Sequence, residues 1–296
     1  ALVEDVRKAG SSLSVEDLRT YRAEVSSALN ITLNNHTTVF APGPPMGGAV
    51  LMFILKVLEG KFLAEKGEQE VFRECCSRVE TYHHIAEALK FGNMLRPHMS
   101  DPAFSRAQLV RHRIDARGDH PLSHYNLLES IYNGEYKSMG TSHISVLAAD
   151  GSAVSATSTI NYPHMERIIL SVSALGEKPT SAMVPSILIS KTGDMLVIGG
   201  AGGGWIISAT TMAIINKLWF GYDLERAISA PVMHTLGDSV VFEGHFSEVI
   251  RSGLLRRGHK EEKDKFVMNV VQGISKEGKC ISAYSDKRKL GKSAGY

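Results

Sequence analysis

Hydrophobic and polar positions follow a helical period in the first half of the chain. A capping-box pattern at Ser14 predicts a helix that opens there and runs towards Ala28. Residues 49–58 predict a buried helix, and apolar residues at helical spacing predict another over 82–95. Residues 112–140 are rich in turn residues and show no convincing period, so we expect a long exposed connector there.

The period shortens to that of strands from Thr141 onward. Runs at 143–148 and 153–160 surround Asp150-Gly151 and predict a hairpin, and runs at 184–189 and 195–198 predict a second one. Further strands are predicted at 240–242, 266–272 and 280–285, and helices at 205–218, 224–230 and 247–255. Strands for two sheets, with helices packed outside them, predict an α/β layered sandwich.

Composition and charge narrow the possible partners. With 296 residues the chain suits one large domain or two small ones, and its net charge of +2 does not point to a nucleic-acid partner. Its 3 cysteines give neither a disulfide framework nor a zinc spacing, and no signal peptide or membrane span is visible. Two sequons, at Asn30 and Asn35, favour a secreted or ectodomain context and make both asparagines glycosylation candidates. Because the chain begins at Ala1 in helix-like sequence, we expect that an N-terminal portion is missing.

Thr141 is a candidate nucleophile. It follows Gly140 at the start of a predicted strand, directly after the connector, which is where a self-cleaving precursor would be cut. An N-terminal threonine has its hydroxyl and its own α-amine within reach of each other, so the amine can act as the general base. Taken alone, the tetrapeptide 140–143 also fits an ordinary strand start.

The strand that follows is dense in hydroxyl residues. Alternation places Ser155, Thr157, Thr159 and Asn161 on one face. A face this polar makes a poor core, so it is either exposed to solvent or lines a site.

The glycine run at 199–204, placed before a long apolar helix, suits an oxyanion hole. Glycines let the backbone approach a ligand, and the helix start offers free N–H groups. The Lys-Ser/Thr pair of a phosphate loop is absent, which argues against nucleotide binding, and a tight strand-to-helix turn is the plain alternative. Ser181, in the loop before the next strand, could donate a hydrogen bond to a carboxylate.

Together and in this order, these segments resemble the γ-glutamyltransferase (glutathione hydrolase) family. The matching stretches are TSHISVLAADGSAVSATSTIN at 141–161, GGAGG at 199–203 and SDKRKLGKSAGY at 285–296, with weaker matches at 16–24, 42–45 and 82–90. The resemblance implies an N-terminal-nucleophile hydrolase with an αββα four-layer sandwich. It further implies cleavage between Gly140 and Thr141, with 1–140 as the C-terminal part of a large subunit and 141–296 as the small catalytic subunit.

The resemblance also assigns roles. Thr141 would attack the γ-glutamyl amide of glutathione or of an S-conjugate such as leukotriene C4, and water or an acceptor amino acid or dipeptide would release the acyl group. Thr159 would orient Thr141, and the N–H groups of Gly202 and Gly203 would stabilise the oxyanion. Asn161 and Ser181 would hold the amino and carboxylate ends of the glutamyl group. No metal and no cofactor is implied, and the expected location is the extracellular face of the plasma membrane, with an anchor outside this chain.

Three departures from the family pattern weaken the expected substrate clamp. The stretch after Asn161 is short, and its only acids, Glu166 and Glu177, match no family position that we can identify. A pair of serines is reduced to Ser181-Ala182. The large-subunit arginine that pairs with the substrate carboxylate lies in the expected missing portion. These departures favour a second hypothesis, a truncated or unprocessed family member that folds but does not catalyse the reaction. A third hypothesis is a binding domain without catalytic activity.

Overall fold

The computed structural model describes residues 2–8, 13–62, 75–103, 140–159, 178–263 and 269–295. Except for Gly140, the connector predicted at 112–140 lies outside these residues, as do Asn161, Glu166 and Glu177. The statements below concern the described residues.

A six-stranded antiparallel sheet forms the centre of the molecule and joins residues from before and after position 140. Its strand order is β1-β2-β5-β6-β10-β11. Strand β2 pairs with β5, so the two parts of the chain share one sheet. The bounds are β1 Leu29–Thr32, β2 Thr38–Ala41, β5 Ser186–Ile189, β6 Met195–Ala201, β10 Val270–Glu277 and β11 Cys280–Ser285.

Two predictions for the first half were wrong. The helix that opens at Ser14 has the expected capping box, but α2 (Val15–Thr20) ends at Thr20 instead of running to Ala28. None of its residues is buried, so no packed face extends it. Strands β1 and β2 were not predicted in this mostly helical half. They form because β2 finds its partner about 150 positions later in the chain, which local periodicity does not register.

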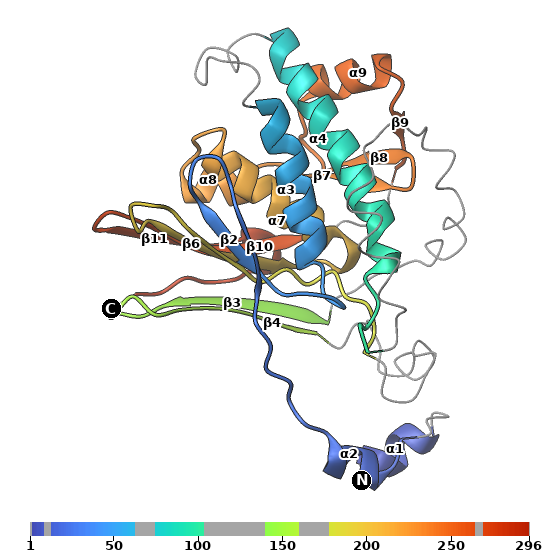
Figure 1. The fold of residues 1–296 in the computed structure, drawn as a ribbon. Helices are drawn as coiled ribbons and strands as arrows, with labels where there is room; N and C mark the ends of the chain where they lie inside the picture. The colour runs from blue at the N-terminus through green and yellow to red at the C-terminus, as the bar shows by residue number, and fades with distance from the viewer. Residues whose placement is uncertain are drawn as a thin grey trace.

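The second sheet is the predicted hairpin of β3 (Thr141–Leu147) and β4 (Ala153–Thr159). It lies against one face of the larger sheet, over β6 and β10. The turn contains Gly151, whose φ of 88° is a conformation that glycine tolerates best. Figure 1 shows the hairpin on one side of the larger sheet and the main helices on the other.

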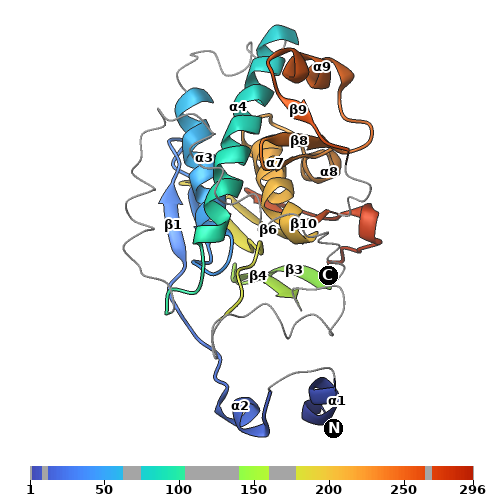
Figure 2. The same ribbon diagram turned by 90° about the vertical axis from the view of Figure 1, so that its right-hand side faces the viewer.

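The helical layer covers the opposite face of the six-stranded sheet (Figures 1 and 2). Helices α3 (Gly48–Phe62), α4 (Cys75–Leu95), α7 (Ile206–Leu218) and α8 (Leu224–Ser229) form this layer, with α9 (Glu248–Arg256) beside α4. The core lies between these helices and the sheet and includes Leu51, Ile54, Ile85, Leu188 and Ile207. No described helix combines the length and apolar character needed to cross a bilayer.

The remaining elements are short. A small sheet of β7 (Met233–Leu236), β8 (Ser239–Phe242) and β9 (Lys260–Glu261) sits beside α4 and α9. The described residues also contain three 3₁₀ turns, η1 (Arg96–His98), η4 (Gly203–Trp205) and η5 (Lys287–Lys289). Helices α1 (Leu2–Lys8) and α2 lie apart from the sheets (Figure 2).

The described residues therefore build a mixed α/β fold with one helical layer and two stacked sheets. The fourth layer of the predicted αββα sandwich would cover the outer face of the hairpin. No described element covers that face, where Ile144, Val146 and Val154 are 59 %, 43 % and 53 % exposed. The complete four-layer arrangement stays a prediction.

Candidate active site

Thr141 opens β3 and lies directly opposite Thr159, the last residue of β4. The two hydroxyl oxygens are 2.7 Å apart and share a hydrogen bond, and the Thr141 residue is only 2 % exposed. Both threonines suit the strand because a β-branched side chain packs well on a pleated surface. The hairpin register therefore brings together the two residues that the sequence paired by resemblance.

The inward face of the hairpin is polar except at the turn end, where Leu147 pairs with Ala153. His143 lies between two hydroxyl groups, with Nδ1 at 2.8 Å from Thr157 Oγ1 and Nε2 at 3.0 Å from Ser145 Oγ. Ser155 donates to the backbone oxygen of Ile198 on β6 at 2.9 Å. The polar face of 155–159 thus packs against the larger sheet and is not simply exposed to solvent, which was one of the two alternatives.

Burial between the sheets keeps His143 neutral. Desolvation lowers the pKa of His143 to about 4, because the charged imidazolium loses its water. The space for the ring exists because Gly199 stands opposite it: a Cβ built there would lie 2.4 Å from His143 Cε1. Gly199 lies inside β6, so packing against the imidazole, and not a turn, favours glycine at this position.

The glycine turn follows β6 and lies at the same end of the sandwich as Thr141. Ser155 contacts Ile198, and His143, which pairs with Thr157, contacts Gly199. The contacts with β6 therefore move towards its glycine end as β4 runs towards Thr159. Beyond Ala201, Gly202 and Gly203 take φ values of 138° and 59°. These conformations favour glycine, and the first N–H groups of the helical segment have no partner inside it.

Two basic residues flank this end of the sandwich. Lys289 of η5 donates from Nζ to the backbone oxygen of Thr141 at 2.5 Å. Arg96 of η1 lies against the turn, since a Cβ on Gly204 would be 3.1 Å from its Nη1. Sequence reasoning assigned neither a role. For Lys289 a signal existed, because it belongs to the quoted C-terminal stretch 285–296; for Arg96 there was none.

Ser181 is buried in a loop that its own neighbours stabilise. Its N–H donates to Pro45 O at 2.8 Å, and its Oγ accepts from the Met183 N–H at 3.2 Å. The loop of 42–48 therefore holds Ser181 in place, and its hydroxyl hydrogen is left to donate elsewhere. Asn161, its expected partner in substrate binding, is outside the described residues.

Both sequon asparagines are exposed at the outer edge of the sheet. Asn30 is on the edge strand β1 and Asn35 in the turn that follows. The Asn35 side chain accepts from the Thr37 N–H at 3.1 Å, as expected in an Asx-turn. Both positions are accessible to a modifying enzyme.

A separate cluster on the helical layer offers metal-ligand atoms. His83, Glu87 and His259 place one such atom each within 4.8 Å of one another. However, the buried ammonium of Lys90 lies 3.0 Å from His259 Nδ1 and 3.3 Å from Glu87. If Lys90 donates to Nδ1, Nε2 of a neutral His259 carries the hydrogen and can donate to His83 at 2.7 Å. Burial, followed by the charge of Lys90, lowers the pKa of His259 to about 4. The hydrogen bonds within the cluster and the Lys90 ammonium therefore already occupy the atoms that would bind a metal ion.

Comparison with known proteins places the chain in a family. The family model described as Gamma-glutamyltranspeptidase matches residues 1–165 and 170–296. The human "Glutathione hydrolase 5 proenzyme" is 41 % identical over 353 residues, and the rat protein of that name is 43 % identical over 341. Each match covers 100 % of this chain but 58 % of the relative, so the chain spans little more than half their length. These relatives show that the chain is similar to the glutathione hydrolase 5 branch of the family, which the sequences of 183–189 and 197–203 also resemble.

The matches also bear on the stretch after Asn161. The match to the human protein extends over 353 residues, more than the 296 of this chain, so the chain lacks residues that this relative has within the matched region. The family match is interrupted at 166–169, inside the stretch that looked short after Asn161.

A solved structure of low sequence identity has a similar fold. The structure titled LmbA2991HD superposes with a TM-score of 0.64 at 18 % identity, over 94 % of this chain and 57 % of that one. At this identity the likeness concerns the fold alone. The family match, which covers nearly every residue, shows on its own that the chain belongs to the γ-glutamyltranspeptidase family.

Proposed function

We propose that this chain carries the catalytic half of a self-processing γ-glutamyl hydrolase and transferase. The precursor cuts itself between Gly140 and Thr141, and residues 1–140 and 141–296 stay together as parts of a large and a small subunit. The substrates are glutathione and its S-conjugates, including the conversion of leukotriene C4 to D4, with acceptor amino acids or dipeptides in transfer. No metal or organic cofactor takes part in this scheme.

In the proposed reaction the Thr141 hydroxyl attacks the γ-carbonyl carbon of the glutamyl group. The free α-amine of Thr141 accepts the hydroxyl proton and returns it to the departing amine. Water, or the amine of an acceptor, then attacks the γ-glutamyl ester and regenerates Thr141. Thr159 orients the nucleophile through the 2.7 Å hydrogen bond, which is the observation that supports this proposal most directly.

The glycine turn and the buried loop supply the other roles. The N–H groups of Gly202 and Gly203 stabilise the tetrahedral oxyanion, and the loss of one such donor typically costs about 3–4 kcal/mol in the barrier. Ser181 donates to the substrate carboxylate, and Asn161 binds at the amino end. The left-handed glycine conformations and the firm hold on the Ser181 backbone support these roles.

The test begins with the cleavage. Intact-mass and N-terminal analysis of purified protein should reveal a second N-terminus reading Thr-Ser-His-Ile. Thr141→Ala should leave the chain uncut, while Thr141→Ser, which keeps a hydroxyl, should still be cut more slowly. The cut wild type should release product from a γ-glutamyl anilide. Correctly cut protein without any release would contradict the enzymatic proposal.

A second candidate function is that of a folded family member without turnover. The interruption of the family match at 166–169 favours it, because this interruption lies in the short stretch after Asn161 that weakens the expected substrate clamp. An uncut wild-type chain would support it. Adding the N-terminal portion of a relative separates the two cases: restored cleavage and turnover support the enzyme, and persistent failure to bind glutathione supports the inactive member.

The exposed sequons support an extracellular location, which we propose together with a membrane anchor outside this chain. Expression in a secreting eukaryotic cell should give glycosylated protein. Treatment with an N-glycosidase should then reduce its mass, and Asn30→Gln with Asn35→Gln should abolish that difference. An unmodified secreted chain would contradict the use of these sites.

A further inference from the structure

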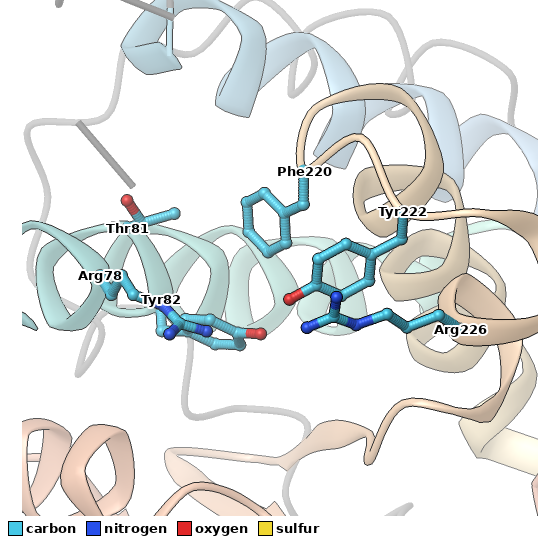
Figure 3. A pocket seen from close by; sticks show the side chains of 6 residues that line it. All are labelled: Arg78, Thr81, Tyr82, Phe220, Tyr222 and Arg226. Carbon is cyan, nitrogen blue, oxygen red and sulfur yellow. The ribbon is translucent and has the colours of Figure 1, made fainter. Parts of the chain in front are cut away.

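A pocket on the helical layer lies between α4 and the turn that joins α7 to α8. Its volume is about 180 Å³, equal to roughly six water molecules at ~30 Å³ each. It shares no residue with the Thr141 site. Figure 3 shows Tyr82 of α4 and Arg226 of α8 pointing towards each other. The lining residues are Arg78, Thr81, Tyr82, Phe220, Tyr222 and Arg226.

The polar groups of this lining are predominantly hydrogen-bond donors. Arg78 and Arg226 carry fixed positive charge, and Thr81, Tyr82 and Tyr222 add hydroxyl groups. Burial raises the pKa of Tyr82 to about 12, so its hydroxyl keeps its proton near neutral pH. None of the described residues in the lining carries a carboxylate. A site with this inventory is complementary to an anion.

The acids nearest in sequence to the two arginines are engaged with other groups. Glu80, on the same helix as Arg78, lies 2.7 Å from Arg257. Glu225, next to Arg226, lies 3.5 Å from Lys287, and Asp223 caps the start of α8.

Among the described residues, the two pocket arginines therefore have no internal counter-charge. Within the described residues, neither guanidinium has a carboxylate partner. The Arg226 guanidinium instead lies 4.0 Å from the centroid of the Tyr222 ring. A guanidinium stacked in this way keeps its planar donor fork available for a bidentate oxyanion.

The walls between the arginines are aromatic. Phe220 makes ring contacts with Tyr82 at 6.0 Å and with Tyr222 at 6.1 Å between centroids. The pocket thus combines two cations with flat apolar surfaces, and its volume leaves room for a small carbon skeleton beside the charged group.

We propose that this pocket binds a small organic oxyanion, a carboxylate or a phosphate carried on a flat or ring-shaped group. The guanidinium groups of Arg78 and Arg226 hold the oxyanion, the phenol hydroxyls donate to its remaining oxygens, and the ring lies against Phe220 and Tyr222. The site is separate from the Thr141 chemistry and does not depend on the proposed function.

Titration calorimetry on the full chain tests the proposal with four probes: phenyl phosphate, benzoate, inorganic phosphate and phenol. We expect saturable binding of phenyl phosphate or benzoate, with the stronger of the two identifying the oxyanion. Inorganic phosphate and phenol, which each lack one half of the ligand, should bind at least tenfold more weakly. Added salt should weaken the binding.

Matched variants locate the binding. Arg78→Gln and Arg226→Gln should each weaken it by at least tenfold, the loss expected for a charge-assisted hydrogen bond. Tyr222→Phe, which keeps the ring, should have a smaller effect. Arg256→Gln removes an exposed arginine of α9 and should leave binding unchanged.

Two outcomes would overturn the assignment. One is the absence of saturable binding of either aromatic oxyanion to protein whose thermal unfolding remains cooperative. The other is binding that both pocket arginine variants leave intact. Equal affinity for inorganic phosphate and phenyl phosphate would overturn the part of the proposal that concerns the ring. Self-cleavage at Thr141, followed in the same variants, should be unchanged and so separates this site from the catalytic one.

Discussion

The β3–β4 hairpin packs its more polar face against the larger sheet and exposes its more apolar face, the reverse of most stacked sheets. The inward face, which packs on the larger sheet, carries mainly hydroxyl groups and a histidine, whereas the outward face carries Ile144, Val146 and Val154 in exposed positions. In an ordinary sandwich the apolar face lies inside. Here hydrogen bonds hold the space between the two sheets together. A buried polar group is costly when it lacks a partner, but a satisfied hydrogen-bond network fixes side-chain orientation better than apolar packing does. The predictions below test whether the inward face serves chemistry and whether the outward face matters for the folded chain.

The largest expected effect is on the inward face at Thr159. Thr159→Val keeps the β-branched shape and removes the hydroxyl that bonds Thr141. Losing a hydrogen bond of about 1.5–3 kcal/mol to a reacting group should slow self-cleavage by roughly 10- to 150-fold. A time course of cleavage by intact mass measures it. The control is Ser158→Val on the adjacent outward position, and equal rates in the two variants would remove Thr159 from the site.

The second effect concerns pH and His143. Its pKa in the folded protein, about 4, is below the ~6.5 of an unfolded histidine. The unfolded chain therefore binds the proton first, so the His143 contribution to stability is complete above pH ~6.5 and is lost as the pH falls towards 4. The full loss amounts to at most about 3 kcal/mol at 1.36 kcal/mol per pKa unit.

Urea unfolding of the wild type and His143→Gln at pH 7 and pH 5 isolates this contribution. Between these values we expect the wild type to lose about 2 kcal/mol more than the variant. His234, whose pKa burial and Arg96 lower to about 3, titrates in both proteins, so its effect cancels. Parallel pH dependence in the two proteins would show that His143 is not buried between the sheets.

A third effect tests how closely the two sheets approach. Gly199→Ala places a methyl group 2.4 Å from the present position of His143 Cε1, and overpacking of this kind typically costs about 1–3 kcal/mol. In the control Gly60→Ala nothing lies within 4 Å of the added Cβ, and the helix should gain about 0.5–1 kcal/mol. His143→Ser should reduce the cost of Gly199→Ala. If the double variant still loses the same free energy of unfolding, the loss comes from a clash with the backbone and not with the imidazole ring.

Sequence alone predicted the local parts of this site and missed what depends on distant contacts. The hairpin around Asp150-Gly151 follows from its turn residues and the strand-like runs on either side, so its strands were predicted within two residues of their bounds. Alternation also separated its two faces. It did not show which face lies inside, because an apolar face normally does, and here the polar one is buried.

The glycine run shows the same limit. A turn before a helix was predicted, and a turn is present at Gly202 and Gly203. However, β6 extends through Gly199 and Gly200 to Ala201, because β10 pairs along it, and that pairing spans about 70 positions in the chain. The contact of Lys289 with Thr141 spans 148 positions. Contacts of this kind arise from the packed fold, and no local spacing encodes them.

The smallest expected effect is on the outward face, and its size decides what that face is. Ile144→Thr keeps a β-branched residue opposite Ala156 and removes apolar area that is already 59 % exposed. An exposed substitution of this kind usually changes the free energy of unfolding by less than about 0.5 kcal/mol. Thermal unfolding and sedimentation velocity of the variant and wild type measure stability and association together. A loss of about 2 kcal/mol or more, or a change in oligomeric state, would mean that residue 144 is covered in the folded protein. The apolar outward face would then be a second interior, and the hairpin would lie between two packed layers instead of at the edge of one.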